Sequence, residues 1–240
     1  MEQTLIISDT PSKDLYRIAG VMALIIVLAG LIDAVTSQGI EARDNRLIPV
    51  IEWFTLFQSN GFAAFSRLGI INMLTLTCGI PVYLAFIQAF RKDRPALAMF
   101  AAILFWVGAA VYLSSNTVFA LFAVNQQYTA ASTVQKPLLE AAGNAVLAQG
   151  ADLTPGTFVG LGLAQIAGLL ITSGMLRVNP FGKWTGRAGL AGFSLMTVFF
   201  ILSAFFPAHY AAAIAISVPG GLLLMAYQLM LARKFFQLGR

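Results

Sequence analysis

The stretch Met175–Leu190, MLRVNPFGKWTGRAGL, places three cations and a Pro-Phe-Gly turn between two long apolar segments. The cations are Arg177, Lys183 and Arg187. A run of roughly 20 apolar residues is long enough to cross a bilayer as a helix, and the segments on both sides reach that length. Cations beside such segments are typical of the cytoplasmic connections of membrane proteins. We therefore interpret this stretch as a polar hinge between two transmembrane helices.

The composition of the whole chain also indicates a membrane protein. Of the 240 residues, 58% are hydrophobic and 10% are charged, whereas a soluble domain has about 25% charged residues. The net charge of +5 does not indicate nucleic-acid binding, because the cations form short clusters between apolar segments rather than one basic stripe. Cys78 is the single cysteine, which excludes an intrachain disulfide and a CxxC redox pair.

Six apolar segments predict six transmembrane helices, because a segment in lipid must satisfy its backbone hydrogen bonds internally. The predicted helices cover residues 16–36, 68–90, 95–124, 155–176, 183–206 and 208–232. The segments are apolar on all sides, whereas the strands of a membrane barrel alternate between apolar and polar residues. The sequence thus predicts one all-α domain over residues 1–240, a polytopic membrane protein with two longer outer loops.

The distribution of cations predicts the orientation. Cations close to the membrane favour the cytoplasmic side. If the N-terminus lies in the cytoplasm, 11 of the 15 Lys and Arg residues are cytoplasmic: Lys13, Arg17, Arg91, Lys92, Arg94, Arg177, Lys183, Arg187, Arg233, Lys234 and Arg240. The outer side then keeps Arg43, Arg46, Arg67 and Lys136. We predict that both termini are cytoplasmic.

The two outer loops, residues 38–67 and 125–154, are longer than simple connections. The first contains IPVIEWFTLF, for which we predict a short helix on the outer interface or folded back over the bundle. The second has Ser132 followed three residues later by Gln135, a pattern that often starts a helix. Three apolar residues then recur at helical spacing: Leu138, Ala142 and Val146. We predict an amphipathic helix there that lies against the membrane or the bundle, an ordinary structured loop being the alternative.

Four motifs resemble one known family. They are FSRLGIINMLTL at residues 65–76, GMLRVNPFGKWTGRAGLAGF at 174–193, YRIAG at 16–20 and LARKFFQLGR at 231–240. Together they resemble a bacterial family of six-helix integral membrane proteins, domain of unknown function 4386, over nearly the whole chain. The resemblance implies a bacterial inner-membrane protein and no particular activity. It would lead us to expect an acidic residue where this chain has Asn72.

Polar residues within the predicted helices are candidates for a functional site, because such residues are costly in a membrane. Five of them share a depth toward the outer face: Asp33, Arg67, Asn72, Asn116 and His209. We predict an outward-facing polar vestibule in which Asp33 and Arg67 pair or bind a small polar ligand. The alternative is structural, since polar side chains also tie helices together. The sequence predicts no catalytic residues, no metal site and no cofactor.

The predicted role is non-enzymatic: binding of a small or lipid-like ligand, or service as an accessory subunit in the lipid bilayer. One alternative is a small-solute transporter or channel, whose inner half would need a polar lining formed by Gln165, Thr172, Ser173 and Gln228. Another is an intramembrane enzyme, in which Asp33, Arg67 or His209 would converge on a reacting group. The oligomeric state is open.

Overall fold

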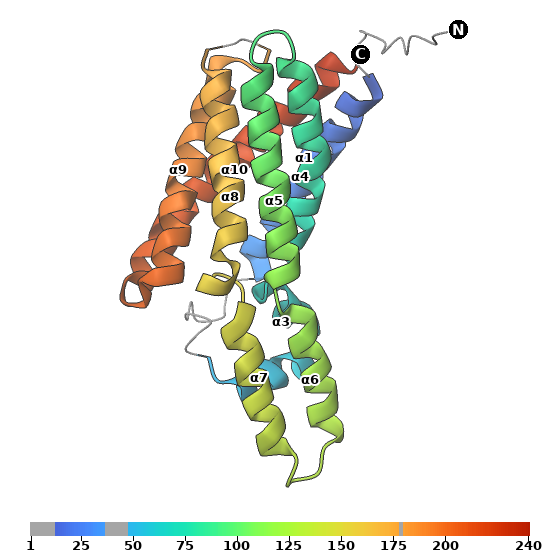
Figure 1. The fold of residues 1–240 in the computed structure, drawn as a ribbon, viewed down its shortest axis with the longest axis vertical. Coiled ribbons are helices and arrows are strands. Elements are labelled where there is room, and N and C mark those ends of the chain that lie inside the picture. Colours follow the sequence, from blue (N-terminus) through green and yellow to red (C-terminus); the bar gives the residue numbers. More distant parts are fainter. Residues whose placement is uncertain (1–12, 37–47, 178–179) are drawn as a thin grey trace, which may run out of the picture.

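The computed structural model describes residues 13–36, 48–177 and 180–240, and every secondary-structure element within these ranges is a helix. Six helices are long and apolar enough to cross a membrane. They form the long bundle in Figure 1: α1 (Lys13–Thr36), α4 (Ile70–Phe90), α5 (Pro95–Ser115), α8 (Pro155–Met175), α9 (Lys183–Phe205) and α10 (Tyr210–Leu238). The predicted all-α polytopic fold is confirmed.

Most predicted helix boundaries lie within a few residues of those observed, with two exceptions. The last helix continues to Leu238. The predicted helix 95–124 is interrupted at Asn116 and Thr117, so that α6 (Val118–Ala130) is a separate element. At the break, the Asn116 side chain accepts a hydrogen bond from the Val118 N–H at 3.0 Å. Asparagine side chains offer the backbone such local alternatives to helix hydrogen bonds.

The six long helices are arranged in a ring in which each packs against its two neighbours, in the order α1, α4, α5, α8, α9, α10 and back to α1. Aromatic side chains fill the ring at the end where α1 begins. These side chains are at most 4% exposed: Tyr16, Phe86, Phe90, Phe181 and Phe235. The Phe181 ring lies 5.5 Å from that of Phe86 and 5.4 Å from that of Phe235. This end of the bundle is closed by apolar packing.

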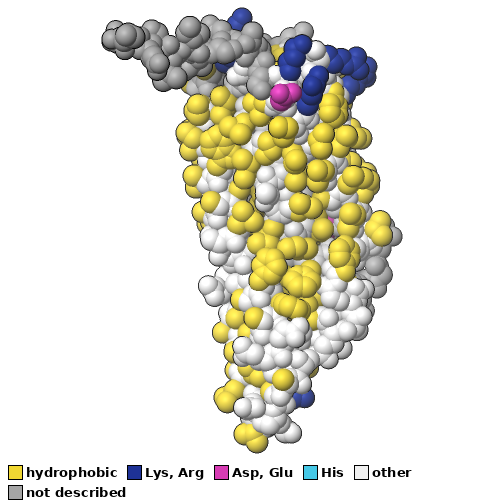
Figure 2. All heavy atoms as spheres, turned by 90° about the vertical axis from the view of Figure 1, so that its right-hand side faces the viewer, with side chains coloured by type: hydrophobic (Ala, Val, Ile, Leu, Met, Phe, Trp, Pro, Cys, Tyr) yellow, Lys and Arg dark blue, Asp and Glu magenta, His cyan; other side chains and the backbone are white. Residues whose placement is uncertain are grey.

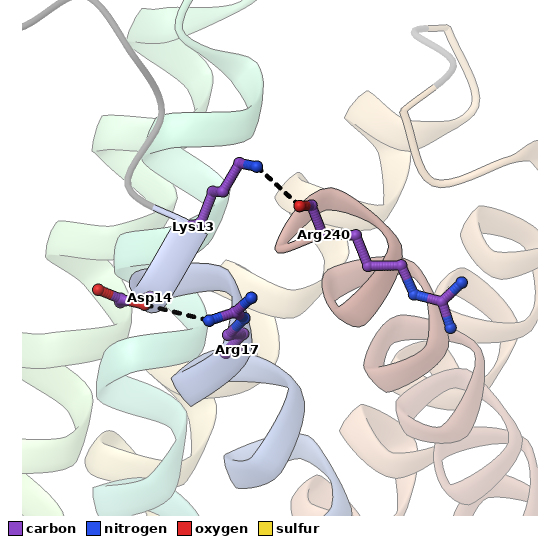
Figure 3. A network of polar contacts seen from close by, with 4 residues as sticks. All are labelled: Lys13, Asp14, Arg17 and Arg240. Carbon is purple, nitrogen blue, oxygen red and sulfur yellow. Dashed lines mark hydrogen bonds and ion pairs between the residues drawn. The ribbon is translucent and has the colours of Figure 1, made fainter.

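The cations that were predicted to be cytoplasmic lie at the same end of the bundle, where α1 begins. It holds the start of α1, the α4–α5 turn, the α8–α9 hinge and the end of α10 (Figure 1), and Figure 2 shows Lys and Arg side chains gathered there. We refer to it as the cationic end. Lys13 donates a hydrogen bond to the main-chain oxygen of Arg240 at 2.7 Å, and Arg17 lies 3.6 Å from Asp14 (Figure 3). The Lys13 bond joins the start of α1 to the end of α10, whereas the Asp14–Arg17 pair lies within α1.

The opposite end carries a helical lobe that extends beyond the bundle (Figure 1). We define the lobe as α2 (Val50–Ser59), α3 (Gly61–Arg67), α6 and α7 (Lys136–Gly150). It has its own hydrophobic core, which includes Val50, Trp53, Phe54, Phe57, Leu121 and Leu147. The short helix predicted within IPVIEWFTLF is confirmed as α2, and it packs against α6 and α7. Residues 37–47 lie outside the described part of the chain.

The helix predicted from residue 132 onward exists, but its predicted apolar face is only partly right. Leu138 is 72% exposed and Ala142 is also exposed. The buried residues of α7 are Gly143, Leu147 and Gly150. The reason is that α7 packs against α2 through a glycine: a Cβ atom on Gly143 would lie 2.6 Å from Cγ2 of Val50. Of the three apolar residues that helical spacing indicated, only Val146 packs against the core of the lobe.

Candidate functional site

Three interruptions of the helices meet where the bundle joins the lobe. Gly69 precedes α4 with a left-handed φ of +98°. Asn116 and Thr117 separate α5 from α6, and residues 151–154 separate α7 from α8. The Thr117 N–H donates to the Gly150 carbonyl at 3.1 Å, which fixes the second break beside the third. Backbone groups freed at helix breaks need such partners.

Asp152 is the centre of this junction. Its side chain is 4% exposed, and its carboxylate accepts hydrogen bonds from the Tyr112 hydroxyl at 2.5 Å and from the Asn72 amide at 2.9 Å. A buried carboxylate is costly unless donors compensate for lost water. Asn72 belongs to α4 and Tyr112 to α5, so the carboxylate joins two bundle helices to the α7–α8 connection.

Asn116 extends the same set of contacts to the backbone. Its amide nitrogen donates to the Leu68 carbonyl at 2.8 Å and to the Tyr112 hydroxyl oxygen at 3.2 Å. We call Asn72, Tyr112, Asn116 and Asp152 the junction network. Gly69 lies directly against it, because a Cβ atom there would lie within 3 Å of Tyr112, Asn116 and Asp152. The network is tightly packed and leaves no room for a side chain at position 69.

Asp33 and Arg67, for which the sequence suggested a pair, have different partners. The Asp33 carboxylate accepts a hydrogen bond from Ser66 at 3.2 Å, and the Ser66 hydroxyl lies 3.0 Å from that of Thr36. The Arg67 guanidinium lies over the Trp53 ring, 5.4 Å from its centroid. These contacts join α1 to α3 and α3 to α2, so both charged residues tie elements together around the junction.

His209 lies apart from the other predicted site residues. It is exposed in the short turn η2 (Pro207–His209) between α9 and α10, with its ring 6.4 Å from that of Phe206. Of the five predicted residues, the structure brings Asn72 and Asn116 into one network and places Asp33 and Arg67 on the neighbouring α1–α3 and α2–α3 contacts.

Sequence reasoning missed Asp152 and Tyr112. Asp152 lies in the predicted outer loop 125–154. The search for polar site residues covers only the predicted helices, so it passes over this residue. A signal was present, because Asp152 is the last acidic residue of the chain and directly precedes the Leu-Thr-Pro start of α8. Tyr112 gave no comparable signal in an apolar helix. Within the described residues, no group of three or more His, Cys, Asp or Glu side chains could hold a metal ion.

Comparison with known proteins does not add to this geometry. No protein-family model, no curated protein and no solved structure matches the chain. Membership of the six-helix bacterial family therefore stays a prediction, and the function must be inferred from the contacts themselves.

The polar residues that a transport path would need are engaged locally. The Thr172 hydroxyl donates to the Gly168 carbonyl at 2.7 Å, and the Ser173 hydroxyl donates to the Leu170 carbonyl at 2.7 Å. Both bonds lie within α8. In the described part of the chain, the buried amide oxygens of Gln165 and Gln228 have no hydrogen-bond partner. These four residues thus form no hydrogen-bonded chain among themselves.

Proposed function

We propose that this chain is a non-enzymatic accessory subunit of a bacterial inner membrane. The bundle anchors it, both termini lie in the cytoplasm, and the lobe faces outward to contact a partner protein. The distribution of cations supports this orientation, because the cationic end carries 11 of the 15 Lys and Arg residues.

The junction network is the observation that carries this proposal. A ligand-binding vestibule needs polar groups that are free to meet a ligand, but the donors of Asn72 and Tyr112 are directed at Asp152, which is 4% exposed. Buried polar groups whose hydrogen bonds are all made within the protein fix geometry. The network therefore supports a rigid connection between bundle and lobe.

The tip of the lobe supports a protein partner. α7 has 15 residues, which corresponds to a length of about 22 Å. The turn between α6 and α7 lies at the far end of the lobe from the bundle (Figure 1), and Figure 2 shows hydrophobic side chains at this tip. Val134 is 83% exposed and Leu138 72% exposed. We expect the tip to lie beyond the lipid that surrounds the bundle, where a partner protein would cover such side chains.

The alternatives receive less support. A transporter needs a polar path, but buried aromatic side chains such as Phe86, Phe181 and Phe235 close the ring at the cationic end. An intramembrane enzyme needs convergent groups, but Asp33, Arg67 and His209 have separate surroundings.

Site-specific photocrosslinking in native membranes tests the proposed partner. A photoreactive amino acid at Leu138 should give an adduct of defined mass with one protein. The matched control is Leu28, an exposed leucine of α1 that is 58% accessible and faces outward from the bundle. There we expect lipid adducts alone. Absence of a protein adduct at Leu138, or the same adduct at both positions, would exclude the lobe tip as the contact surface.

Native mass spectrometry from lipid nanodiscs tests the ligand-binding alternative. A stoichiometric ligand other than phospholipid, lost in Arg67→Ala, would replace the accessory-subunit proposal by binding near Asp33, Ser66 and Arg67. A protein that carries only bulk lipid would agree with the proposed role.

A further inference from the structure

The C-terminal part of the chain has an unbalanced charge. After Asp152 the sequence contains no acidic residue, although it contains six cations. All six belong to the cationic end: Arg177, Lys183, Arg187, Arg233, Lys234 and Arg240. The three helices α8, α9 and α10 therefore have no internal counter-charge for these side chains.

The α8–α9 hinge concentrates three of these charges. Lys183 and Arg187 are one helical turn apart on the same face of α9, and Arg177 follows the end of α8. All three are exposed. Like charges four residues apart on a helix repel one another and destabilise it unless an opposite charge lies nearby. The arrangement calls for an anion from outside the chain.

The neighbouring Trp184 sets the depth of this cluster. Trp184 is 74% exposed, and the Arg187 guanidinium lies over its ring at 4.9 Å from the centroid. Tryptophan side chains of membrane proteins favour the level of the lipid headgroups. The stacking contact therefore holds the Arg187 charge at the level where lipid phosphates lie.

In the part of the chain that the structure describes, the acidic residues of the cationic end are Asp14 and Asp93, which lie outside α8, α9 and α10. Asp14 on α1 lies 3.6 Å from Arg17 (Figure 3). Asp93 lies in the α4–α5 turn, flanked by Lys92 and Arg94. In the ring, α9 packs against α8 and α10 rather than against α1 or α4. In the described part of the chain, neither carboxylate forms an ion pair with a hinge cation.

We propose that the α8–α9 hinge binds the headgroup of an anionic phospholipid through Arg177, Lys183 and Arg187, with Trp184 beside it at the interface. Clusters of cations next to transmembrane helices attract anionic lipids, and each added cation strengthens the attraction. This site lies at the opposite end of the molecule from the lobe and is independent of the proposed accessory role.

Native mass spectrometry of protein released from nanodiscs of equal phosphatidylcholine and phosphatidylglycerol tests the proposal. The wild-type protein should retain phosphatidylglycerol in preference. The double variant K183Q/R187Q should lower that preference about tenfold. The matched control K92Q/R94Q removes the same charge from the α4–α5 turn and should retain the wild-type preference. Added inorganic phosphate should not displace the retained lipid.

Three results would overturn the proposal: equal retention of both lipids by the wild type, an equal loss in the hinge and control variants, or displacement by inorganic phosphate. Thermal unfolding in detergent verifies that each variant folds. If K183Q/R187Q does not fold, Trp184→Leu takes its place in the comparison. Equal retention of both lipids by the wild type overturns the proposal whichever variant is used.

Discussion

At the scale of single residues, the buried Asp152 carboxylate accepts hydrogen bonds from two donors. Asp152→Ala would remove the acceptor of the Asn72 amide and the nearest acceptor of the Tyr112 hydroxyl. The hydroxyl would keep only its longer contacts with the Asn116 amide at 3.2 Å and the Gly69 carbonyl at 3.4 Å. We expect the free energy of unfolding to fall by about 3 kcal/mol, because loss of the acceptor costs about 1–3 kcal/mol for each of the two donors. Titration with a denaturing detergent in mixed micelles measures this loss. Asp33→Ala is the control and should cost about 1 kcal/mol, since it removes one hydrogen bond from Ser66. Equal losses would contradict a central role for Asp152.

Gly69 offers a second test of the junction. Gly69→Ala introduces a Cβ atom at a φ of +98°, 2.2 Å from the Tyr112 hydroxyl. The backbone penalty alone is about 1–2 kcal/mol, and displacement of Tyr112 adds to it. Gly61→Ala is the matched control, because nothing lies within 4 Å of its Cβ position. We expect the melting temperature to fall strongly for Gly69→Ala and to change little for Gly61→Ala. A tolerated alanine at position 69 would show that the junction can rearrange.

Only some residues of the junction network could be predicted from the sequence. Asn72 and Asn116 stood out because a polar side chain in an apolar helix is a local signal. Asp152 bonds to residues 80 and 40 positions away in the chain. Those contacts depend on how α4, α5 and the α7–α8 connection come together, which no local pattern encodes. The Asp33–Arg67 pair was suggested by depth alone, and depth does not determine which way a side chain turns.

At the scale of helices, the contact between α5 and α8 depends on glycine. A Cβ atom on Gly160 would lie 2.6 Å from Tyr112 Cβ and 2.8 Å from the Gly108 carbonyl oxygen. We expect Gly160→Ala to separate the two helices and lower stability by about 1–3 kcal/mol, as overpacking does. Gly162→Ala on the same helix meets only Phe158 at 3.7 Å and should be nearly neutral. Detergent-induced unfolding of both variants measures the difference, and equal stabilities would contradict close packing at Gly160.

The long helices could be predicted from sequence because length and hydropathy are local properties. The lobe could not, because its helices meet through distant contacts. The Phe65 ring of α3 lies 5.1 Å from Phe122 of α6, and the Phe57 ring of α2 lies 5.5 Å from Phe122. A hydropathy pattern shows that these rings are apolar but not which helix each one meets. The sequence therefore predicts two separate outer loops, each with its own helix, rather than one folded unit.

At the scale of the whole molecule, the charge asymmetry predicts which end faces the cytoplasm. In a Cys78→Ala background, a cysteine at the exposed Val134 of the lobe tip should react with a membrane-impermeant maleimide added to intact spheroplasts. A cysteine at Lys92, exposed in the α4–α5 turn, should react only after permeabilisation. The reason is the concentration of 11 of the 15 cations at that end. The reverse labelling pattern would invert the orientation and place the lobe in the cytoplasm.

α5 leads into α6, and α7 into α8, through breaks of two and four residues, so the lobe is connected to the bundle like a lever. Its arm is about 22 Å long, the length of the 15-residue α7, and its fulcrum is the level at which both pairs of helices are interrupted. A lateral force on the tip of the lobe would therefore exert a torque on α5 and α8. Because these two helices meet backbone to backbone at Gly108 and Gly160, they tilt together. We expect the stiffness of this fulcrum to depend on the hydrogen bonds that the Asp152 carboxylate accepts, so that a single substitution there would let the lobe bend relative to the bundle.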